Sequence, residues 1–240
     1  MNLLLALFLT TIPFADTQKI AEKIWKNECG GSVEGLTHWK QGENFGSFGI
    51  GHFIWYPAEK KERFEETFPT LLLFLQKKGI ELPFWLKNIK GCPWNTREEF
   101  YQDFDSSQMI SLRKLLFDTK QLQALFIAER LEKALPDLDP SLKKVFDRLA
   151  SDQKGLYALI DYLNFKGAGT SPSEAYQGQR WGLLQVLERI SPTSRDLLSD
   201  FVASAKIILT QRVQNAPPER HEEQWLKGWL NRINTYLEGP

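Results

Sequence analysis

Two neighbouring stretches, IWKNECGG (residues 24–31) and ENFGSFGIGH (residues 43–52), decide how the N-terminal part of this chain folds. Ile20, just before the first stretch, and Ile24 and Glu28 within it recur at helical spacing, and a Gly-Gly pair follows. We therefore predict a helix that begins near Asp16 and ends just before Gly30. In the second, glycines alternate with aromatic residues, which predicts a small hairpin or three-stranded element within residues 36–56.

Helical periodicity dominates the rest of the chain. Turn residues divide this part into further predicted helices over 69–77, 96–104, 106–117, 119–135, 141–150, 154–164, 173–190, 194–215 and 218–237. None of the connecting segments is long enough to require separate domains. The pattern therefore predicts a mainly α (α+β) fold, with residues 16–240 as one largely helical domain and a small β-hairpin element near its N-terminus.

Composition limits the functions to be considered. The chain has 240 residues, of which 42% are hydrophobic, so it can bury a substantial core. Its 30 Lys and Arg residues are balanced by 30 Asp and Glu residues, which leaves no excess positive charge for binding phosphate backbones. We expect no nucleic acid partner. The spacing of the three histidines does not predict a metal site, and we expect no cofactor.

Residues 1–15 form an apolar run that is too short to span a bilayer, which takes about 20 residues. We interpret it as a signal peptide, which predicts export to the periplasm or the exterior; the alternative is a buried N-terminal helix. No later stretch predicts a membrane span, since the apolar run 71–75 lies between a proline and a Lys-Lys-Gly turn.

The chain contains two cysteines, Cys29 and Cys92. In an oxidising compartment they would most simply form one disulfide, which would stabilise the fold by roughly 4 kcal/mol in the chain-entropy account. The alternative is two unpaired buried thiols. A nucleophilic role for Cys29 is disfavoured because the C-terminal end of a helix opposes formation of a thiolate.

Glu28 is the main candidate for chemistry. In the last turn of the predicted helix it lies near the partial negative charge of the terminal carbonyls, on the face that carries Ile20 and Ile24. Both features favour the protonated carboxyl over the carboxylate. A carboxylic acid held in this state can donate its proton to a glycosidic oxygen. The alternative is a glutamate at the rim of the apolar face that pairs with Lys26 or an arginine.

A helix-end glutamate followed by the segment SFGIGH (residues 47–52) resembles the phage-type lysozymes of the lysozyme-like superfamily. The similarity covers about residues 24–57, and DYLNFKG (residues 161–167) is similar to a later helix end of that group. The resemblance implies a lysozyme-like fold, with Glu28 as general acid and Ser47 at the position of the family's hairpin threonine. It also places the family's second acidic residue near Gln41. Glu43 could supply that carboxylate, as could Glu34 if the loop folds back; otherwise the enzyme works with one carboxylate, an arrangement that resembles the lytic transglycosylases.

The resemblance and the residue types suggest further site residues. His52 matches a family histidine that is structural in those enzymes, and we place it at the edge of the substrate site. Trp39, Trp55 and Tyr56 lie in or beside the hairpin, where alternate side chains must face outward and would stack on sugar rings. Asn164 could bind an N-acetyl group of the substrate or cap its helix.

Three functional hypotheses follow. The first is a glycan-cleaving enzyme, a muramidase-like hydrolase or a lytic transglycosylase, that acts on peptidoglycan or a related N-acetylhexosamine polymer as a monomer. The second is a non-catalytic protein of the same fold that binds or organises the cell wall, motivated by Gln41 in place of an acid. The third is a chitosanase-like inverting hydrolase, whose two carboxyl groups would be roughly 6.5–9.5 Å apart.

Overall fold

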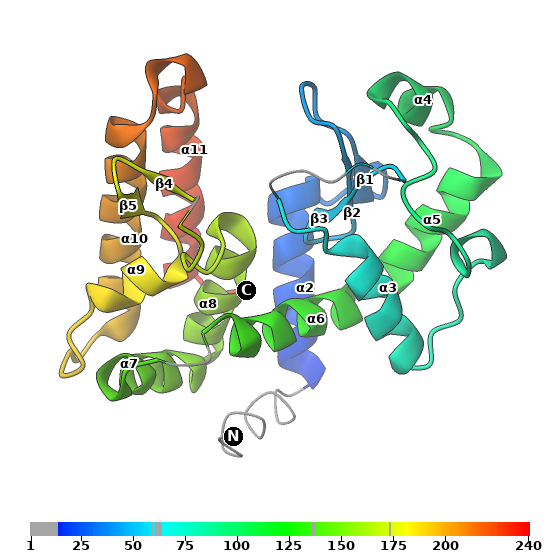
Figure 1. Cartoon of the computed structure of the whole chain (residues 1–240). Helices are drawn as coiled ribbons and strands as arrows, with labels where there is room; N and C mark the ends of the chain where they lie inside the picture. Colours follow the sequence, from blue (N-terminus) through cyan, green and yellow to red (C-terminus); the bar gives the residue numbers. More distant parts are fainter. Residues whose placement is uncertain (1–13, 59, 61–63, 136–137, 173) are drawn as a thin grey trace. The chain divides into compact units, whose positions relative to one another are not determined.

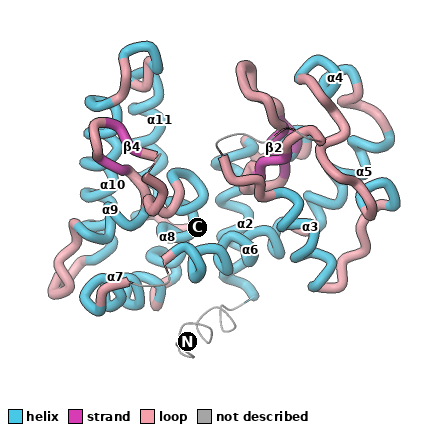
Figure 2. The backbone as a smooth tube through the Cα atoms, in the orientation of Figure 1, coloured by secondary structure: helices cyan, strands magenta, loops and turns pink. Residues whose placement is uncertain are grey.

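The computed structural model describes residues 14–240 except residues 59, 61–63, 136–137 and 173. The chain divides into two compact units, here called the N-terminal unit (described residues up to Phe126) and the C-terminal unit (from Ile127). Figure 1 shows the elements of each along the sequence, and Figure 2 shows that helices predominate in both. The boundary falls inside one helix, α6. The single domain expected over residues 16–240 stays a prediction, and the units are described separately.

The N-terminal unit combines helices with a small antiparallel sheet. Its elements are α2 (Phe14–Cys29), η1 (Glu34–Leu36), β1 (Thr37–His38), β2 (Gly46–Phe48), β3 (Phe53–Trp55), α3 (Phe68–Lys77), η2 (Phe84–Leu86), α4 (Arg97–Gln102), α5 (Ser107–Asp118) and the start of α6 (Lys120–Ala134). The strand order is β1-β2-β3, with Ser47 opposite His38 on one side and Ile54 on the other. Of the two alternatives predicted for residues 36–56, a small hairpin or a three-stranded element, the second is thus confirmed.

Side chains at the helix starts explain several of these boundaries. The hydroxyl of Thr96 accepts a hydrogen bond from the backbone N–H of Glu99 at 3.1 Å, and Ser106 does the same for Met109 at 3.1 Å. Each satisfies an N–H that the first turn of a helix leaves without a partner. α4 and α5 therefore begin where the sequence places a hydroxyl before an amphipathic run.

The core of the N-terminal unit is aromatic. Phe48 in the central strand is fully buried. Its ring centroid lies 4.9 Å from that of Phe68, 5.4 Å from that of Trp55 and 6.1 Å from that of Phe100. All three residues of β2 are buried, so this short strand is covered on both faces. The sheet is therefore part of the core and supports the segments at its ends.

The C-terminal unit is helical apart from one hairpin. After the end of α6 it contains α7 (Pro140–Ala150), α8 (Gln153–Lys166), β4 (Ala175–Tyr176), β5 (Gln179–Arg180), α9 (Leu183–Glu188), α10 (Leu197–Asn215), η3 (Pro218–Arg220), α11 (Glu223–Asn234) and η4 (Thr235–Leu237). The helix predicted over 173–190 is wrong in its first half. Gln177 and Gly178 both have positive φ (50° and 76°), the backbone of a two-residue hairpin turn, and the helix begins only at Leu183.

Two buried ion pairs hold the C-terminal unit together. Asp161, fully buried in α8, accepts two hydrogen bonds of 2.8 Å from Arg232 in α11 and one of 2.7 Å from the hydroxyl of Tyr236. Glu222 accepts two of 2.7 Å from Arg212 and one of 2.9 Å from Tyr176 in the hairpin. These networks tie α8, α10, α11 and β4 to one another.

The fold class expected from the sequence, mainly α with a small sheet near the N-terminus, is confirmed. Over the residues that the structure covers, no helix has the length and apolar character needed to cross a membrane. Of the predicted signal peptide (residues 1–15), the first thirteen lie outside the described residues, and Phe14 and Ala15 belong to α2.

Candidate active site

Glu28 occupies the last turn of α2, as predicted. Gly30 and Gly31 follow with φ of 62° and 69°, a left-handed backbone that ends the helix. Ile20 and Ile24 on the same side are buried, and the Glu28 side chain is 15% exposed. The carboxyl group therefore lies at a helix end, largely shielded from solvent but still reachable.

The chain after the glycines returns close to the end of α2. A Cβ at Gly35 in η1 would lie 2.3 Å from the carbonyl oxygen of Cys29, so no larger residue fits there without a shift. Ser32 reinforces the turn, since its hydroxyl donates to that same carbonyl at 3.2 Å and accepts from the N–H of Gly35 at 3.0 Å. η1 and β1 are thereby held against the helix end that carries Glu28.

His52 faces Glu28 from the turn between β2 and β3. Its Nδ1 lies 3.8 Å from Oε2 of Glu28, an ion-pair distance when the ring is protonated, and its side chain is 28% exposed. On the other side of the ring, Nε2 lies 3.4 Å from the carbonyl oxygen of Gly35 and 3.7 Å from Sγ of Cys29. His52 has φ of 48°, a strained backbone for a non-glycine residue, which the surrounding contacts must maintain.

A buried glutamine fixes the turn that carries His52. Gln123 in α6 is fully buried, and its Oε1 accepts a hydrogen bond of 2.9 Å from the N–H of Ile50. Its Nε2 donates to the carbonyl of Leu116 at 2.6 Å and to Thr119 at 3.0 Å. A Cβ at Gly49, which has φ of 74°, would lie 2.3 Å from this Oε1. The close approach of Gln123 to the turn therefore requires a glycine at position 49.

A second histidine lies beside the first. The rings of His38 and His52 are nearly parallel, with centroids 6.1 Å apart and 19° between the ring planes. The hydroxyl of Tyr101 is 3.4 Å from Nδ1 of His38. Partial burial lowers the pKa of His38, and the positive charges of His52, Arg97 and Lys40 lower it further. A neutral ring is thus favoured at this position.

Both cysteines are free and buried, so the predicted Cys29–Cys92 disulfide is wrong. The two thiols are buried in different parts of the core. The backbone N–H of Cys92 donates a hydrogen bond of 2.8 Å to the carbonyl of Tyr56. Burial, and then the charge of Glu28, raises the pKa of Cys29 to about 12; burial is also the main cause that raises the pKa of Cys92 to about 12. These thiols stay protonated, which agrees with the argument against a nucleophilic Cys29.

The candidates for the second carboxylate lie on the segment between α2 and β2. Glu43 is half-buried in the loop between β1 and β2, and burial raises its pKa, although Lys40 acts in the opposite direction. Its own carbonyl accepts a hydrogen bond of 2.7 Å from the indole N–H of Trp39. Glu34 is exposed in η1, and Gln41 is exposed as well. Ser47 is buried in the central strand.

Trp39, Trp55 and Tyr56 were expected to present their rings to a sugar, and this expectation is wrong. They are only 1%, 1% and 2% exposed. Trp39 packs against Phe100 with centroids 5.9 Å apart, Trp55 against Phe68 at 4.8 Å and Tyr56 against Phe45 at 5.3 Å. The central strand β2 is buried on both faces, so the alternation of side chains around it does not leave these rings exposed.

Asn164 belongs to the other unit. It lies inside α8, three residues before the C-cap Gly167, and is half-buried. The cap itself is a glycine with φ of 81°, so the alternative role of Asn164 as the helix cap is wrong. Its role in binding a substrate stays a prediction.

The sequence reasoning missed His38, Tyr101 and Gln123 as neighbours of this site. Gln123 offered a signal, because it lies on the apolar stripe of α6 with Ile127 and Leu131 at i+4 and i+8, where a polar residue is unexpected. His38 and Tyr101 meet across 63 residues of sequence, a contact that no local pattern indicates. In comparisons with known proteins, no protein-family model, no curated protein and no solved structure matches this chain.

Proposed function

We propose that this protein cleaves a glycan built from N-acetylhexosamines, with peptidoglycan as the leading candidate, and that Glu28 is the general acid. The observation that supports this most is the pairing of a largely shielded helix-end carboxyl with His52, at 3.8 Å between Oε2 and Nδ1. Such a carboxyl group can deliver its proton to the oxygen of a glycosidic bond as that bond breaks.

In the proposed reaction, the proton of Glu28 passes to the bridging oxygen, and the C–O bond breaks with its electron pair retained by the leaving sugar. The other sugar develops oxocarbenium character. The carboxylate that remains on Glu28 then lies 3.8 Å from Nδ1 of His52, an ion-pair distance for a ring that carries a proton on both nitrogens, with Nε2 3.4 Å from the carbonyl oxygen of Gly35. His52 thus acts as a positioning residue and stabilises Glu28 after proton transfer.

The partner that completes the reaction is either a water molecule or a group of the substrate itself. A water molecule would give a hydrolysis product with a reducing end, and Glu43 or Glu34 would then be the carboxylate that activates it or stabilises the oxocarbenium ion. Attack by the substrate's own hydroxyl, assisted by its N-acetyl group, would give a 1,6-anhydro product without a second carboxylate. The raised pKa of Glu43 limits its ionised fraction in mildly acidic solution.

The experiment is mass spectrometry of the soluble products released from purified peptidoglycan sacculi. The proposal predicts released muropeptides, with reducing ends for a muramidase-like hydrolase and 1,6-anhydro ends for a lytic transglycosylase. Sacculi that bind the protein in a pull-down but release no fragments would contradict it and favour the non-catalytic wall-binding alternative. Release from chitosan alone would point to the inverting hydrolase.

A further inference from the structure

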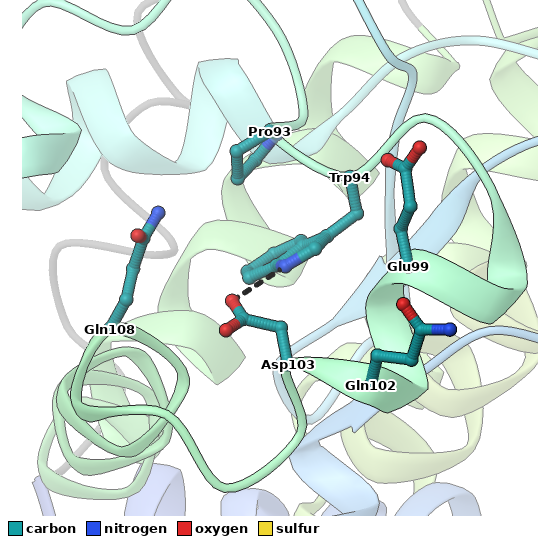
Figure 3. Close-up of a pocket in the computed structure, with 6 residues that line it drawn as sticks. All are labelled: Pro93, Trp94, Glu99, Gln102, Asp103 and Gln108. Carbon is teal, nitrogen blue, oxygen red and sulfur yellow. Dashed lines mark hydrogen bonds between the residues drawn. The ribbon is translucent and has the colours of Figure 1, made fainter.

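A pocket separate from Glu28 opens beside α4 in the N-terminal unit. Its volume of about 400 Å³ lies at the low end of the roughly 300–1,000 Å³ that is typical of small-molecule sites. Figure 3 shows the side chains around it: Pro93, Trp94, Glu99, Gln102, Asp103 and Gln108. None of the proposed catalytic residues is among them.

Two carboxylates in this pocket are held in place by hydrogen bonds from the protein. The indole N–H of Trp94 donates to Oδ2 of Asp103 at 2.8 Å, the bond drawn in Figure 3. Oε2 of Glu99 accepts from the backbone N–H of Asn95 at 2.7 Å and from its side-chain amide at 3.2 Å. Within the described part of the chain, the other oxygen of each carboxylate receives no hydrogen bond. Each is therefore oriented and still able to accept one.

Two carboxamides complete the polar lining. Gln102 is exposed and Gln108 is half-buried, and neither side-chain amide has a hydrogen-bond partner among the residues that the structure describes. In Figure 3 the side chain of Gln108 stands on one side of Trp94, and those of Glu99 and Gln102 stand on the other. Each amide offers both N–H donors and a carbonyl acceptor. The pocket thus presents donors and acceptors beside the half-buried ring of Pro93 and the edge of Trp94, which is only 4% exposed.

We propose that this pocket binds a saccharide. A hydroxyl group donates and accepts at once, so neighbouring hydroxyls of a sugar can serve the carboxylate acceptors and the amide donors together. A free ammonium ion only donates and would leave the amide N–H groups unused. The pocket lining contains two carboxylates and no Lys or Arg, which opposes binding of an anion. The proposal goes beyond the catalytic role of Glu28 and does not depend on it.

The test is NMR on the full-length protein labelled with ¹⁵N at tryptophan. The indole N–H of Trp94 bonds to Asp103 inside the pocket, so its resonance, assigned with Trp94→Phe, reports on a ligand there. We use N,N′-diacetylchitobiose and cellobiose as probes. The expected result is a saturable shift of this resonance with a dissociation constant on the order of 1 mM, as befits a small polar ligand in an open site.

A paired variant and a matched control separate binding from folding. Gln102→Ala with Gln108→Ala removes both free amides, neither of which contributes a side-chain hydrogen bond within the described chain, so the fold should persist. We expect the dissociation constant to rise at least about tenfold. Gln76→Ala removes an exposed glutamine of α3, outside the pocket, and should leave the dissociation constant unchanged.

Two results would overturn the proposal. One is a Trp94 resonance that stays in place at saturating concentrations of both disaccharides. The other is a shift that ethylammonium chloride produces at matched ionic strength and the sugars do not, which would make the pocket a site for cations. Neither result bears on cleavage of sacculi, so failure here is distinguishable from failure of the proposed catalytic function.

Discussion

Adjacent residues at the end of α2 have different environments. Successive residues of an α-helix are separated by about 100° around its axis. Glu28 therefore keeps part of its side chain in contact with solvent, while Cys29 is buried, with Sγ 3.6 Å from the carbonyl of Gly49. The same helix end thus carries a partly accessible carboxyl group at position 28 and a buried, inert thiol at position 29. Only the glutamate is thus suited to proton transfer.

The thiols give the first prediction. With the pKa of Cys29 and of Cys92 raised to about 12 by burial, neither should react with Ellman's reagent at pH 8 in the native protein. Unfolding in guanidinium chloride without reductant should release two reactive thiols per chain. We expect two reactive thiols per chain in the denatured sample and none in the native sample. No reactive thiol in the denatured sample would mean that the disulfide forms.

Glu43 gives a pH-dependent prediction. Burial raises its folded-state pKa above the ordinary value of 4.5, so its stabilising contribution is complete below that value and is lost as the pH rises through the folded-state pKa. Glu43→Gln removes a charge that the folded state disfavours. The variant should therefore have a higher urea midpoint than the wild type at pH 7 and no advantage at pH 4. A urea midpoint that falls equally at pH 4 and pH 7, relative to the wild type, would contradict this account.

At the scale of elements, the catalytic candidates depend on how α6 meets the sheet. Gln123 is the connection, since it bonds to the N–H of Ile50 and to the carbonyl of Leu116, while Gly49 leaves room for its amide. The turn that this contact fixes brings His52 to Glu28. His52 lies in this turn with φ of 48°.

Gln123→Leu tests this connection. The change leaves the Ile50 N–H and the Leu116 carbonyl without their partner in a buried place, which costs about 1–3 kcal/mol for each unsatisfied group. We expect the free energy of unfolding, measured in urea, to fall by at least about 1 kcal/mol. Gln76→Leu on the exposed side of α3 serves as the control and should change it little. Equal stability of the two variants would contradict the role of Gln123.

Local signals predict most helices but not every element. Hydroxyl and aspartate caps mark the starts of α4, α5 and α7 in the sequence. The segment 173–190 was misassigned because Gln177 and Gly178 both take positive φ, and the two isolated glycines of this amphipathic run, Gly178 and Gly182, give little indication of a hairpin. The burial of Trp39 and Trp55 could not be predicted from the sequence either. The alternation of side chains shows that a strand has two faces, but it does not show whether both faces are buried.

The whole molecule consists of two compact units with different cores. The N-terminal unit rests on clustered aromatic rings, whereas the C-terminal unit contains the buried Asp161–Arg232 pair together with Tyr236. In the latter unit, burial opposes ionisation of Glu222, but the hydrogen bonds and charge of Arg212, the hydrogen bond from Tyr176 and the charge of Lys166 together outweigh it and lower the pKa of Glu222. Different interactions therefore stabilise the two units.

Arg232→Met should affect mainly one unit. It leaves the fully buried carboxylate of Asp161 without its counter-ion, which typically costs about 3–5 kcal/mol. Hydrogen exchange measured by mass spectrometry should show lost protection in peptides from residue 138 onward and near-native protection in peptides from 16–58. Arg195→Met, at an exposed position of the same unit, is the control. Equal loss in both regions would contradict this view of the two units.

The sequence pointed to the candidate site through one carboxylate, Glu28, and the turn that contains His52. The structure adds the contacts that hold these two residues in place. The spacing of Glu28 and the glycines predicted the helix end, and the similarity of residues 47–52 to a known motif pointed to His52. The distances between Glu28, His52 and Cys29, and the roles of His38 and Gln123, depend on contacts between residues far apart in the sequence. No periodicity encodes such contacts, so they required the structure.

The central claim is that Glu28 donates the proton that breaks a glycosidic bond. The most direct measurement is the rate at which Glu28→Gln releases muropeptides from purified sacculi, relative to the wild type and to Glu98→Gln, which changes an exposed glutamate of α4. The account predicts a loss of about 10²-fold or more for Glu28→Gln with an unchanged circular dichroism spectrum, and wild-type release by Glu98→Gln. Full release by folded Glu28→Gln would contradict it.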